Sequence, residues 1–514
     1  MLFLLIILVG LSLYLPYLGS YGPLDPTDSF FLESAREMVE KNEFLVPMFN
    51  YKLWLDKPVL CFWFIAAFYK TFGITTLAGR LPSAIASIST SLGIFITLKD
   101  LVNTKTRLLA SLIYLSFPLI AIYSRTPLTD SILTGFMSIV VISMFKVIHS
   151  NTRWDRFIFY IFLALAILCK GPIAMVLIAI LWLSQYFIYG INPFQELKTK
   201  FIYLPEILLF LAVLLPWYIM ASIETHGEFF YKFFIEQNFG RMIGHINHQN
   251  PVWFYIPVIA AGFLPYNMFL VYLKEFWQLN KEKLKCDLSL FSFTWSGICF
   301  VLFSLISTKL PTYIEPGSIG LVICCAIVIN YLDQKQDYRL LKIISLTLSL
   351  ASFVLALNIF IKSKLLSLII LPIRPVLLIC SACFLGVIFI KDYYKFYLFI
   401  FSFLILEASV LPSAFMSYYK IRQTPFNKIT NIIINNKGEA GIIFAEQPSI
   451  QYYLKRKVPS LKSAEEMQNF VNQKCANKYL IVPQEVVSLL KWADPIKYTF
   501  IVKEDKWLLY KINN

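Results

Sequence analysis

The chain has 514 residues, of which 58% are hydrophobic and only 15% are charged. Its mean hydropathy is +0.66, whereas a water-soluble domain carries about 25% charged residues. This composition excludes an ordinary soluble enzyme and indicates a chain that is solvated mainly by lipid. The formal net charge of +15 does not indicate nucleic-acid binding, because the lysines and arginines lie in short segments between long apolar runs.

Thirteen mostly apolar stretches approach the roughly 20 residues that a helix needs to cross a bilayer. We predict membrane spans at about 1–19, 80–98, 107–124, 129–148, 156–170, 172–190, 203–221, 252–273, 288–307, 314–332, 340–361, 370–390 and 395–414. The first stretch lacks the basic start and cleavage site of a secretory signal, so we expect it to be retained. The shorter apolar stretch from Pro58 to Gly73 contains Lys70, and we expect it to form a helix at the membrane interface.

A cytoplasmic N-terminus would place every short basic loop, such as the one with Lys281, Lys283 and Lys285, on the cytoplasmic side. This is the distribution that the positive-inside rule requires. Two larger loops, at about 20–79 and 222–251, are then predicted to be periplasmic. After residue 415, short β-branched and aromatic runs alternate with polar turns. We therefore predict a mainly α-helical transmembrane domain over 1–415 and a small periplasmic α/β domain over 416–514.

In this topology, ionisable residues at the membrane edge gather on the outer side. They are Asp25, Asp28, Asp56, Lys57, Arg125, Asp130, Lys170 and Lys309. Charged groups in such positions are costly and indicate function. Carboxylates can accept a proton from a hydroxyl, and lysines can bind phosphate, although an interfacial lysine can also simply extend its ammonium into water. The convergence predicts an outward-facing polar cavity.

Other patterns in the outer loops have plainer interpretations. Glu33, Arg36, Glu37 and Glu40 recur at helical spacing, which predicts an amphipathic helix with a solvated charged face. The sequence from Asp25 to Asp28 also fits a turn followed by a helix cap. His245 and His248 supply two ligands where a metal usually takes three or four, so by themselves they are typical of surface histidines. Nucleotide-binding loops and the zinc-protease motif are not found in the sequence.

Several short motifs occur in a fixed order over about residues 1–330. They are Thr27 to Met38, Asp56-Lys57-Pro58, Arg80 to Ala84, Thr129-Asp130, Cys169-Lys170-Gly171, Leu215-Pro216-Trp217, His248 to Trp253 and Lys309 to Tyr313. Together they resemble the lipid A aminoarabinose transferase family, part of the protein mannosyltransferase-like superfamily with the GT-C fold. Each motif is weakly specific, whereas the ordered set is highly specific.

The resemblance implies an inverting transfer of a sugar from a polyprenyl-phosphate carrier, such as undecaprenyl phosphate, to a periplasmic-side acceptor. Aminoarabinose is the family's sugar, and lipid A or another envelope glycan is the expected acceptor. The resemblance implies that a first-loop acid, Asp28 or Asp25, is the base and that Lys57 binds the lipid phosphate. Together with the charges that gather on the outer side, we expect Asp130 as a further catalytic residue and Arg125, Lys170, Lys309 and Tyr313 as substrate-binding residues. Asp56 and His248 would bind a divalent metal, either zinc, magnesium or manganese.

The sequence also departs from the family pattern. Thr27 stands where the family has the first acid of a pair, so the choice of base between Asp25 and Asp28 stays open. The alternatives are an enzyme that glycosylates protein hydroxyls, as a protein O-mannosyltransferase does, a transporter or flippase of lipid-linked substrates, and a non-catalytic assembly subunit. A transporter would place its charges nearer the middle of the membrane, which favours the enzyme.

Overall fold

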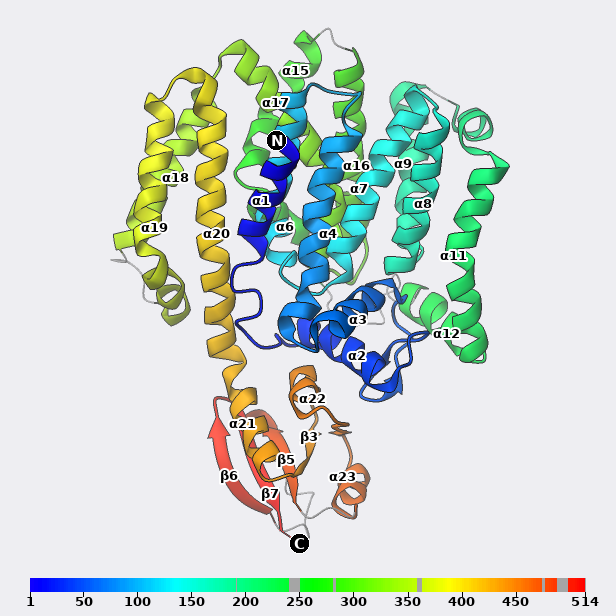
Figure 1. Cartoon of the computed structure of the whole chain (residues 1–514), viewed down its shortest axis with the longest axis vertical. Helices are drawn as coiled ribbons and strands as arrows, with labels where there is room; N and C mark the ends of the chain where they lie inside the picture. The colour runs from blue at the N-terminus through cyan, green and yellow to red at the C-terminus, as the bar shows by residue number, and fades with distance from the viewer. Residues whose placement is uncertain are drawn as a thin grey trace. The chain divides into compact units, whose positions relative to one another are not determined.

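The computed structural model describes residues 1–190, 192–239, 250–280, 283–357, 363–473, 477–487 and 498–513. The described chain is mainly helical and divides into two compact units. The first unit comprises residues 1–18, 55–64 and 80–414, and the second comprises 19–54, 65–79 and 415–514. Figure 1 shows the elements of each unit in the colours of their position along the chain.

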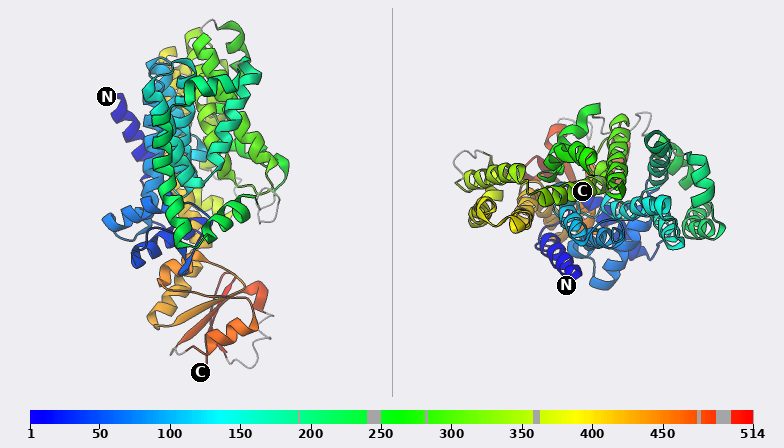
Figure 2. Two further views of the ribbon diagram at one scale, coloured as in Figure 1. Left: turned by 90° about the vertical axis from the view of Figure 1, so that its right-hand side faces the viewer. Right: turned by 90° about the horizontal axis from the view of Figure 1, so that it is seen from above.

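The first unit is a bundle of long helices, many of which run roughly side by side (Figure 2). Its α-helices are α1 (Leu2–Tyr14), α4 (Thr76–Thr97), α5 (Thr104–Leu115), α6 (Pro118–Tyr123), α7 (Thr129–His149), α8 (Arg153–Lys170), α9 (Ile173–Tyr189), α10 (Pro193–Glu196), α11 (Leu204–Glu224), α12 (Glu228–Phe230), α14 (Tyr255–Gly262), α15 (Leu273–Leu279), α16 (Lys283–Leu305), α17 (Ser318–Lys335), α18 (Arg339–Leu357), α19 (Lys364–Phe389) and α20 (Lys395–Arg422). Shorter 3-10 or π-helical turns are η1 (Leu197–Phe201), η2 (Tyr231–Phe239), η3 (Val252–Phe254), η4 (Tyr266–Tyr272), η5 (Pro311–Gly317) and η6 (Asp392–Tyr394).

Among the described residues, seven helices are long and apolar enough to cross a membrane, or up to eight if one bent pair counts as a single span. The seven are Thr129–His149, Leu204–Glu224, Lys283–Leu305, Pro311–Lys335, Arg339–Leu357, Lys364–Phe389 and Lys395–Arg422, and the bent pair is Val252–Gly262 with Tyr266–Leu279. Each of the thirteen predicted stretches contains a helix, and seven or eight of them pass this test of length and hydropathy within the described residues. Several stretches form helices that are too short, broken or polar; α1, for example, has 13 residues.

A close contact between α16 and α17 sets the position of η5, the turn that enters α17. A Cβ atom added to Gly320 of α17 would lie 2.0 Å from the carbonyl oxygen of Ser292 in α16. The indole N–H of Trp295 in α16 donates to the carbonyl of Pro316 in η5 at 2.7 Å. Glycine therefore allows the two helices to approach closely enough for α16 to hold the η5 backbone.

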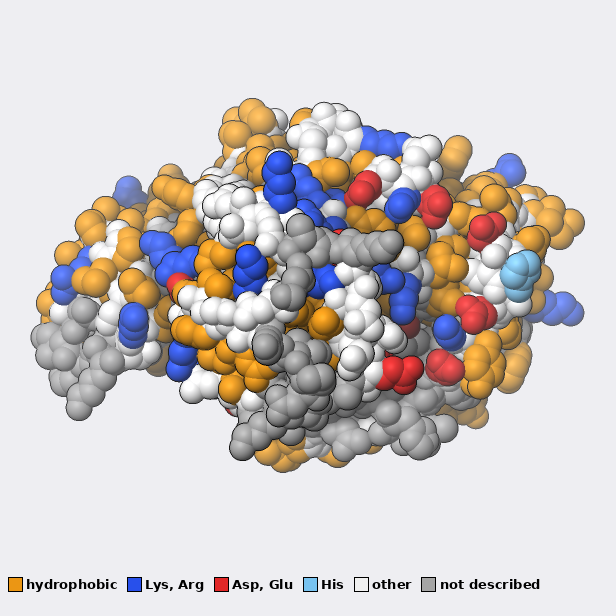
Figure 3. Space-filling model, turned by 90° about the horizontal axis from the view of Figure 1, so that it is seen from below, with side chains coloured by type: hydrophobic (Ala, Val, Ile, Leu, Met, Phe, Trp, Pro, Cys, Tyr) orange, Lys and Arg blue, Asp and Glu red, His pale blue; other side chains and the backbone are white. Residues whose placement is uncertain are grey.

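The second unit contains a five-stranded sheet in the order β4-β3-β5-β7-β6. Its strands and covering helices are β3 (Glu439–Ile443), β4 (Ser460–Leu461), β5 (Lys478–Pro483), β6 (Tyr498–Glu504), β7 (Trp507–Ile512), α21 (Thr424–Asn435), α22 (Pro448–Leu454) and α23 (Ala464–Val471). Strand β3 pairs in parallel with β4 and β5, while β7 pairs antiparallel with β5 and β6. This confirms the predicted α/β fold at the C-terminus. Figure 3 shows charged side chains of both signs interspersed with hydrophobic ones on the face seen from below.

Most of the first loop belongs to this second unit, which differs from the predicted division at residue 415. The loop contributes α2 (Thr27–Lys41) and a hairpin of β1 (Met48–Phe49) and β2 (Lys52–Leu53), and α3 (Leu60–Phe72) follows it. The Asn50 side chain forms two hydrogen bonds of 2.9 Å with the backbone of Val458. Pairing between residues so far apart in sequence leaves no local signal, so the loop appeared to belong to the transmembrane domain.

Three of the four charged residues on this face of α2 are buried, so the prediction of a solvated face is wrong for them and holds only for Glu40, whose side chain is 44% exposed. Glu33, Arg36 and Glu37 are 0%, 2% and 0% exposed. The Arg36 guanidinium donates to both oxygens of Glu33 at 2.7 and 2.8 Å, and the backbone N–H of Tyr51 donates to Glu37 at 2.8 Å. Charges at helical spacing look the same in sequence whether they face water or each other, so their burial depends on the hairpin that covers them.

Asp25 ties the first loop to the C-terminal part of the second unit. Its Oδ1 accepts the backbone N–H of Ser449 at 2.8 Å, and the hydroxyls of Ser449 and Ser29 also donate to its carboxylate. Burial raises the pKa of Asp25 from its ordinary value of 3.8 to about 6, although these hydrogen bonds oppose the rise. The carboxylate of Asp25 therefore serves to hold two distant segments together.

We expect Gly320→Ala to destabilise the first unit by about 1–3 kcal/mol, because the added methyl group overpacks the α16–α17 contact. Gly386→Ala in α19 is the matched control. Its added methyl group would lie 3.7 Å from the nearest atom of Leu398, and alanine favours a helix more than glycine does. Thermal unfolding of the purified protein in detergent measures both effects, and equal melting temperatures for the two variants would contradict the close contact.

The raised pKa of Asp25 predicts a pH-dependent stability. The folded state binds this proton more tightly than the unfolded state, so the contribution is present below pH 3.8 and is lost as the pH rises through about 6. Wild type should therefore lose stability over this range relative to Asp25→Asn, which does not titrate. Melting temperatures across the range measure the difference. Glu485→Gln, which changes a side chain that is 79% exposed, should follow wild type, and parallel curves for wild type and Asp25→Asn would refute the assignment.

Candidate active site

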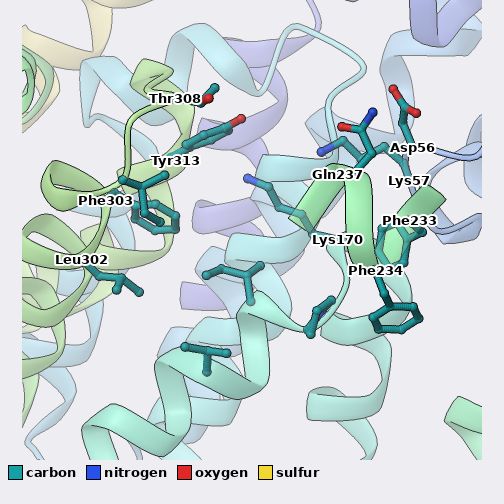
Figure 4. A pocket seen from close by; sticks show the side chains of 14 residues that line it. Asp56, Lys57, Lys170, Phe233, Phe234, Gln237, Leu302, Phe303, Thr308 and Tyr313 are labelled. Carbon is teal, nitrogen blue, oxygen red and sulfur yellow. The ribbon is translucent and has the colours of Figure 1, made fainter. Parts of the chain in front are cut away.

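A cavity of about 340 Å³ lies within the first unit (Figure 4). Its polar lining residues come from the segment before α3, the end of α8, η2 and the turn around η5. They are Asp56, Lys57, Lys170, Gln237, Thr308 and Tyr313. The other lining residues are apolar: Pro172, Ile173, Val176, Phe233, Phe234, Leu302, Phe303 and Ile306. The cavity thus combines two cationic side chains with a largely hydrocarbon wall.

Lys170 lies at the C-terminus of α8, where Gly171, with a φ of +98°, ends the helix. Its ammonium forms an ion pair with Asp130, and it lies 4.4 Å from the centroid of the Tyr313 ring. The side chains of Lys170 and Asp130 are 8% and 9% exposed. Asp130 is in the first turn of α7, so each charge occupies the helix end whose dipole stabilises it. The structure thereby brings together three residues that the sequence predicted for the site.

Lys57 reaches the same cavity from the segment that precedes α3. Two ammonium groups can together bind a phosphate. Because the remaining wall is apolar, the cavity suits a phosphate that carries a hydrocarbon chain.

Two predicted substrate-binding residues have other partners. Arg125 is fully buried and donates to the carbonyls of Leu13 and Tyr14 at 3.1 and 3.0 Å, at the C-terminal end of α1. The Lys309 ammonium donates to the Asn250 carbonyl at 2.9 Å, and the Asn250 amide donates back to the Lys309 carbonyl at 3.2 Å. Neither cation is among the described residues that line the cavity. Their donors satisfy backbone carbonyls, and this geometry does not support their assignment to substrate.

The two candidate bases, Asp25 and Asp28, both belong to the second unit. Asp28 is 4% exposed, lies in the first turn of α2, and its Oδ2 accepts the backbone N–H of Leu24 at 2.7 Å. Both aspartates thus accept hydrogen bonds at the turn before α2, but the N-cap of α2 is Pro26 and no side chain caps the helix, so the cap part of the turn-and-cap interpretation is wrong. The choice of base between the two acids stays a prediction.

The predicted metal ligands are only partly described. Asp56 lines the cavity, whereas His248, like His245, lies outside the described residues. Within the described ranges, no group of three histidine, cysteine, aspartate or glutamate side chains could hold a metal ion. The described residues therefore supply one carboxylate of the predicted pair, and metal binding stays a prediction.

The sequence analysis missed Glu315, a buried acid next to the ion pair. It lies in η5 and is 0% exposed, and neither of its carboxyl oxygens has a hydrogen-bond partner among the described residues. Its charge interacts with those of Asp130 and Lys170. The sequence did hold one signal. Glu315 lies two residues after Tyr313 at the start of a predicted span, where an ionisable residue indicates function.

Comparison with known proteins identifies relatives of the chain. A family model described as dolichyl-phosphate-mannose-protein mannosyltransferase matches residues 56–220. An uncharacterized protein of Aquifex aeolicus is 30% identical over 382 residues, which cover 73% of each chain. The undecaprenyl phosphate-alpha-4-amino-4-deoxy-L-arabinose arabinosyl transferase of Shewanella sediminis is 27% identical, and the match covers 62% of this chain and 57% of the relative.

The fold is also that of a solved protein. ArnT from Cupriavidus metallidurans, in a structure bound to undecaprenyl phosphate, matches with a TM-score of 0.81 at 17% identity, over 99% of this chain and 97% of the other. This likeness confirms the predicted polytopic helical fold with a C-terminal sheet domain. From the ordered motifs, the relatives and the fold, the chain belongs to the aminoarabinose transferase-like family of membrane glycosyltransferases, which use polyprenyl-phosphate donors and have the GT-C fold.

Proposed function

We propose that this protein transfers a sugar from a polyprenyl-phosphate carrier to an acceptor at the periplasmic face of the bacterial inner membrane. The observation that carries the proposal is the cavity in which Lys57 and Lys170 share a lining with apolar side chains. A lipid phosphate has the same two parts, an anion and a hydrocarbon chain. Undecaprenyl phosphate appears in the names of the Shewanella enzyme and of the ArnT complex, which supports this class of donor.

In the proposed reaction, the acceptor hydroxyl oxygen forms a bond to the anomeric carbon while the bond from that carbon to the phosphate oxygen breaks. The leaving phosphate gains negative charge, which the ammonium groups of Lys57 and Lys170 stabilise. A carboxylate accepts the proton of the acceptor hydroxyl. The candidates for this role are the two first-loop acids, Asp28 and Asp25, and the choice between them stays open.

We infer the particular sugar and acceptor from the names of the relatives. Aminoarabinose is the sugar that the Shewanella enzyme's name supports, and lipid A is the acceptor that the family resemblance supports. A protein hydroxyl is the second candidate acceptor, because the matching family model is described as a protein mannosyltransferase. In both cases the same lipid phosphate leaves, so the two candidates differ in the acceptor and in the sugar.

The product can be identified by mass spectrometry of envelope lipids, glycans and proteins from cells with and without the gene. We expect one sugar adduct, on lipid A or another envelope glycan, to disappear with the gene and to return with the wild-type chain. An adduct lost only from proteins would instead identify the second candidate acceptor. Unchanged adducts in all fractions would contradict a transferase and favour a transporter of lipid-linked substrates.

We expect Lys57→Ala and Lys170→Ala each to lower activity at least about tenfold, because each removes a positive charge that faces the leaving phosphate. Lys170→Ala also leaves the buried Asp130 without its cation, so its melting temperature should fall as well. The measurement is sugar transfer by purified protein with the lipid donor. Lys335→Ala is the control, because Lys335 is 45% exposed and pairs with Glu275 at the surface. Wild-type activity in both cavity variants would overturn the assignment.

We further propose that a divalent ion, when bound, is held by Asp56 and His248 and supplies positive charge near the phosphate. Removal of metal with EDTA should then lower activity, and zinc, magnesium or manganese should restore it. Asp56→Asn and His248→Ala should each reduce the metal content of the purified protein, measured by elemental analysis. Full activity after complete removal of metal would refute this part of the proposal.

A further inference from the structure

Glu315 is a buried acid for which the proposed reaction has no role. It is 0% exposed, and both of its carboxyl oxygens lack hydrogen-bond partners among the described residues. Asp130, Lys170 and the buried Tyr114 of α5 lie within electrostatic range of its carboxyl group, but none of them forms a hydrogen bond with it. Burying a carboxylate without a donor is costly, whereas the protonated acid is neutral and carries an O–H that can donate.

If Lys170 binds the lipid phosphate, its ammonium interacts with two anions, the phosphate and Asp130. Its ammonium is already paired with Asp130, and both side chains are less than a tenth exposed. When the ammonium turns toward a phosphate in the cavity, Asp130 loses its cation in a place that water barely reaches. Leaving a buried charge unpaired is strongly unfavourable, so a second hydrogen-bond donor for Asp130 would stabilise the state in which the ammonium engages the phosphate.

We propose that Glu315 is a positioning residue whose O–H donates to Asp130 while Lys170 engages the lipid phosphate. The inference rests on the proposed function and deepens it, because it states how the ion pair opens for the donor. Tyr313, on the same turn η5, lines the cavity and lies against Lys170, while Glu315 is not among the described residues that line it. The turn η5 thus carries both the residue that lies against Lys170 and the residue that we propose as a donor to Asp130.

The test is the binding of undecaprenyl phosphate to the full-length protein in detergent. Glu315→Gln keeps a donor in its amide and should bind within about twofold of wild type. Glu315→Leu has no donor and should bind about tenfold more weakly or worse, the effect of losing a hydrogen bond to a charged group. In an Asp130→Asn background no carboxylate needs the donor, so Glu315→Leu should cause no further loss beyond about twofold.

Glu407→Leu is the matched control. Glu407 in α20 is also buried, with both oxygens unpartnered within the described chain, but its charge acts on Tyr14 and Tyr266. Its loss should leave binding unchanged. Three outcomes would overturn this inference and leave the proposed function intact. Glu315→Gln could weaken binding as much as Glu315→Leu does, or Glu315→Leu could weaken binding equally in the wild-type and Asp130→Asn backgrounds. The third outcome is that Glu315→Leu does not weaken binding at all. Failure of wild type to bind undecaprenyl phosphate would overturn the proposed function and this inference with it.

Discussion

The cost of placing a charged group in an apolar bundle governs this structure. A buried ion without a partner is strongly destabilising, so each charge away from water needs an opposite charge or several hydrogen bonds. Lys170 meets this requirement with Asp130, and Arg125 meets it with the carbonyls at the end of α1. The same constraint operates in the second unit, where Arg36 pairs with Glu33. Charged residues that look alike in the sequence therefore have structural or chemical roles, depending on which partners the fold places next to them.

This constraint also explains why Lys57 and Lys170 stand out. They line a cavity whose other walls are mostly apolar, so a bound phosphate would meet positive charge in a region that admits little water. Electrostatic attraction is stronger there than in bulk solvent, and no reorganisation is needed as charge develops on a leaving group. The pair between Lys170 and Asp130 keeps one of these charges in place before the donor arrives. In the proposed reaction, the resting structure and the anion site thus depend on the same ion pair.

The second unit shows how a loop can be organised by contacts that are remote in sequence. Its buried network on α2, its hairpin and its bonds to the C-terminal sheet domain make the first loop a folded part of that unit. Asp25 contributes by accepting hydrogen bonds from Ser449. These hydrogen bonds give Asp25 a structural role in the second unit.

The sequence by itself determined the membrane character, the helical stretches, the α/β fold of the C-terminus and the family, because hydropathy, period and motif order are local properties. It also identified Lys57, Asp130, Lys170 and Tyr313, since charged or polar residues beside apolar runs stand out. Only the tertiary structure decided which of these share a cavity and which cations cap backbone carbonyls, because both depend on segments that are far apart in the chain. The burial of Glu315 could not be read from the sequence for the same physical reason, because the helices that cover it are remote in the chain.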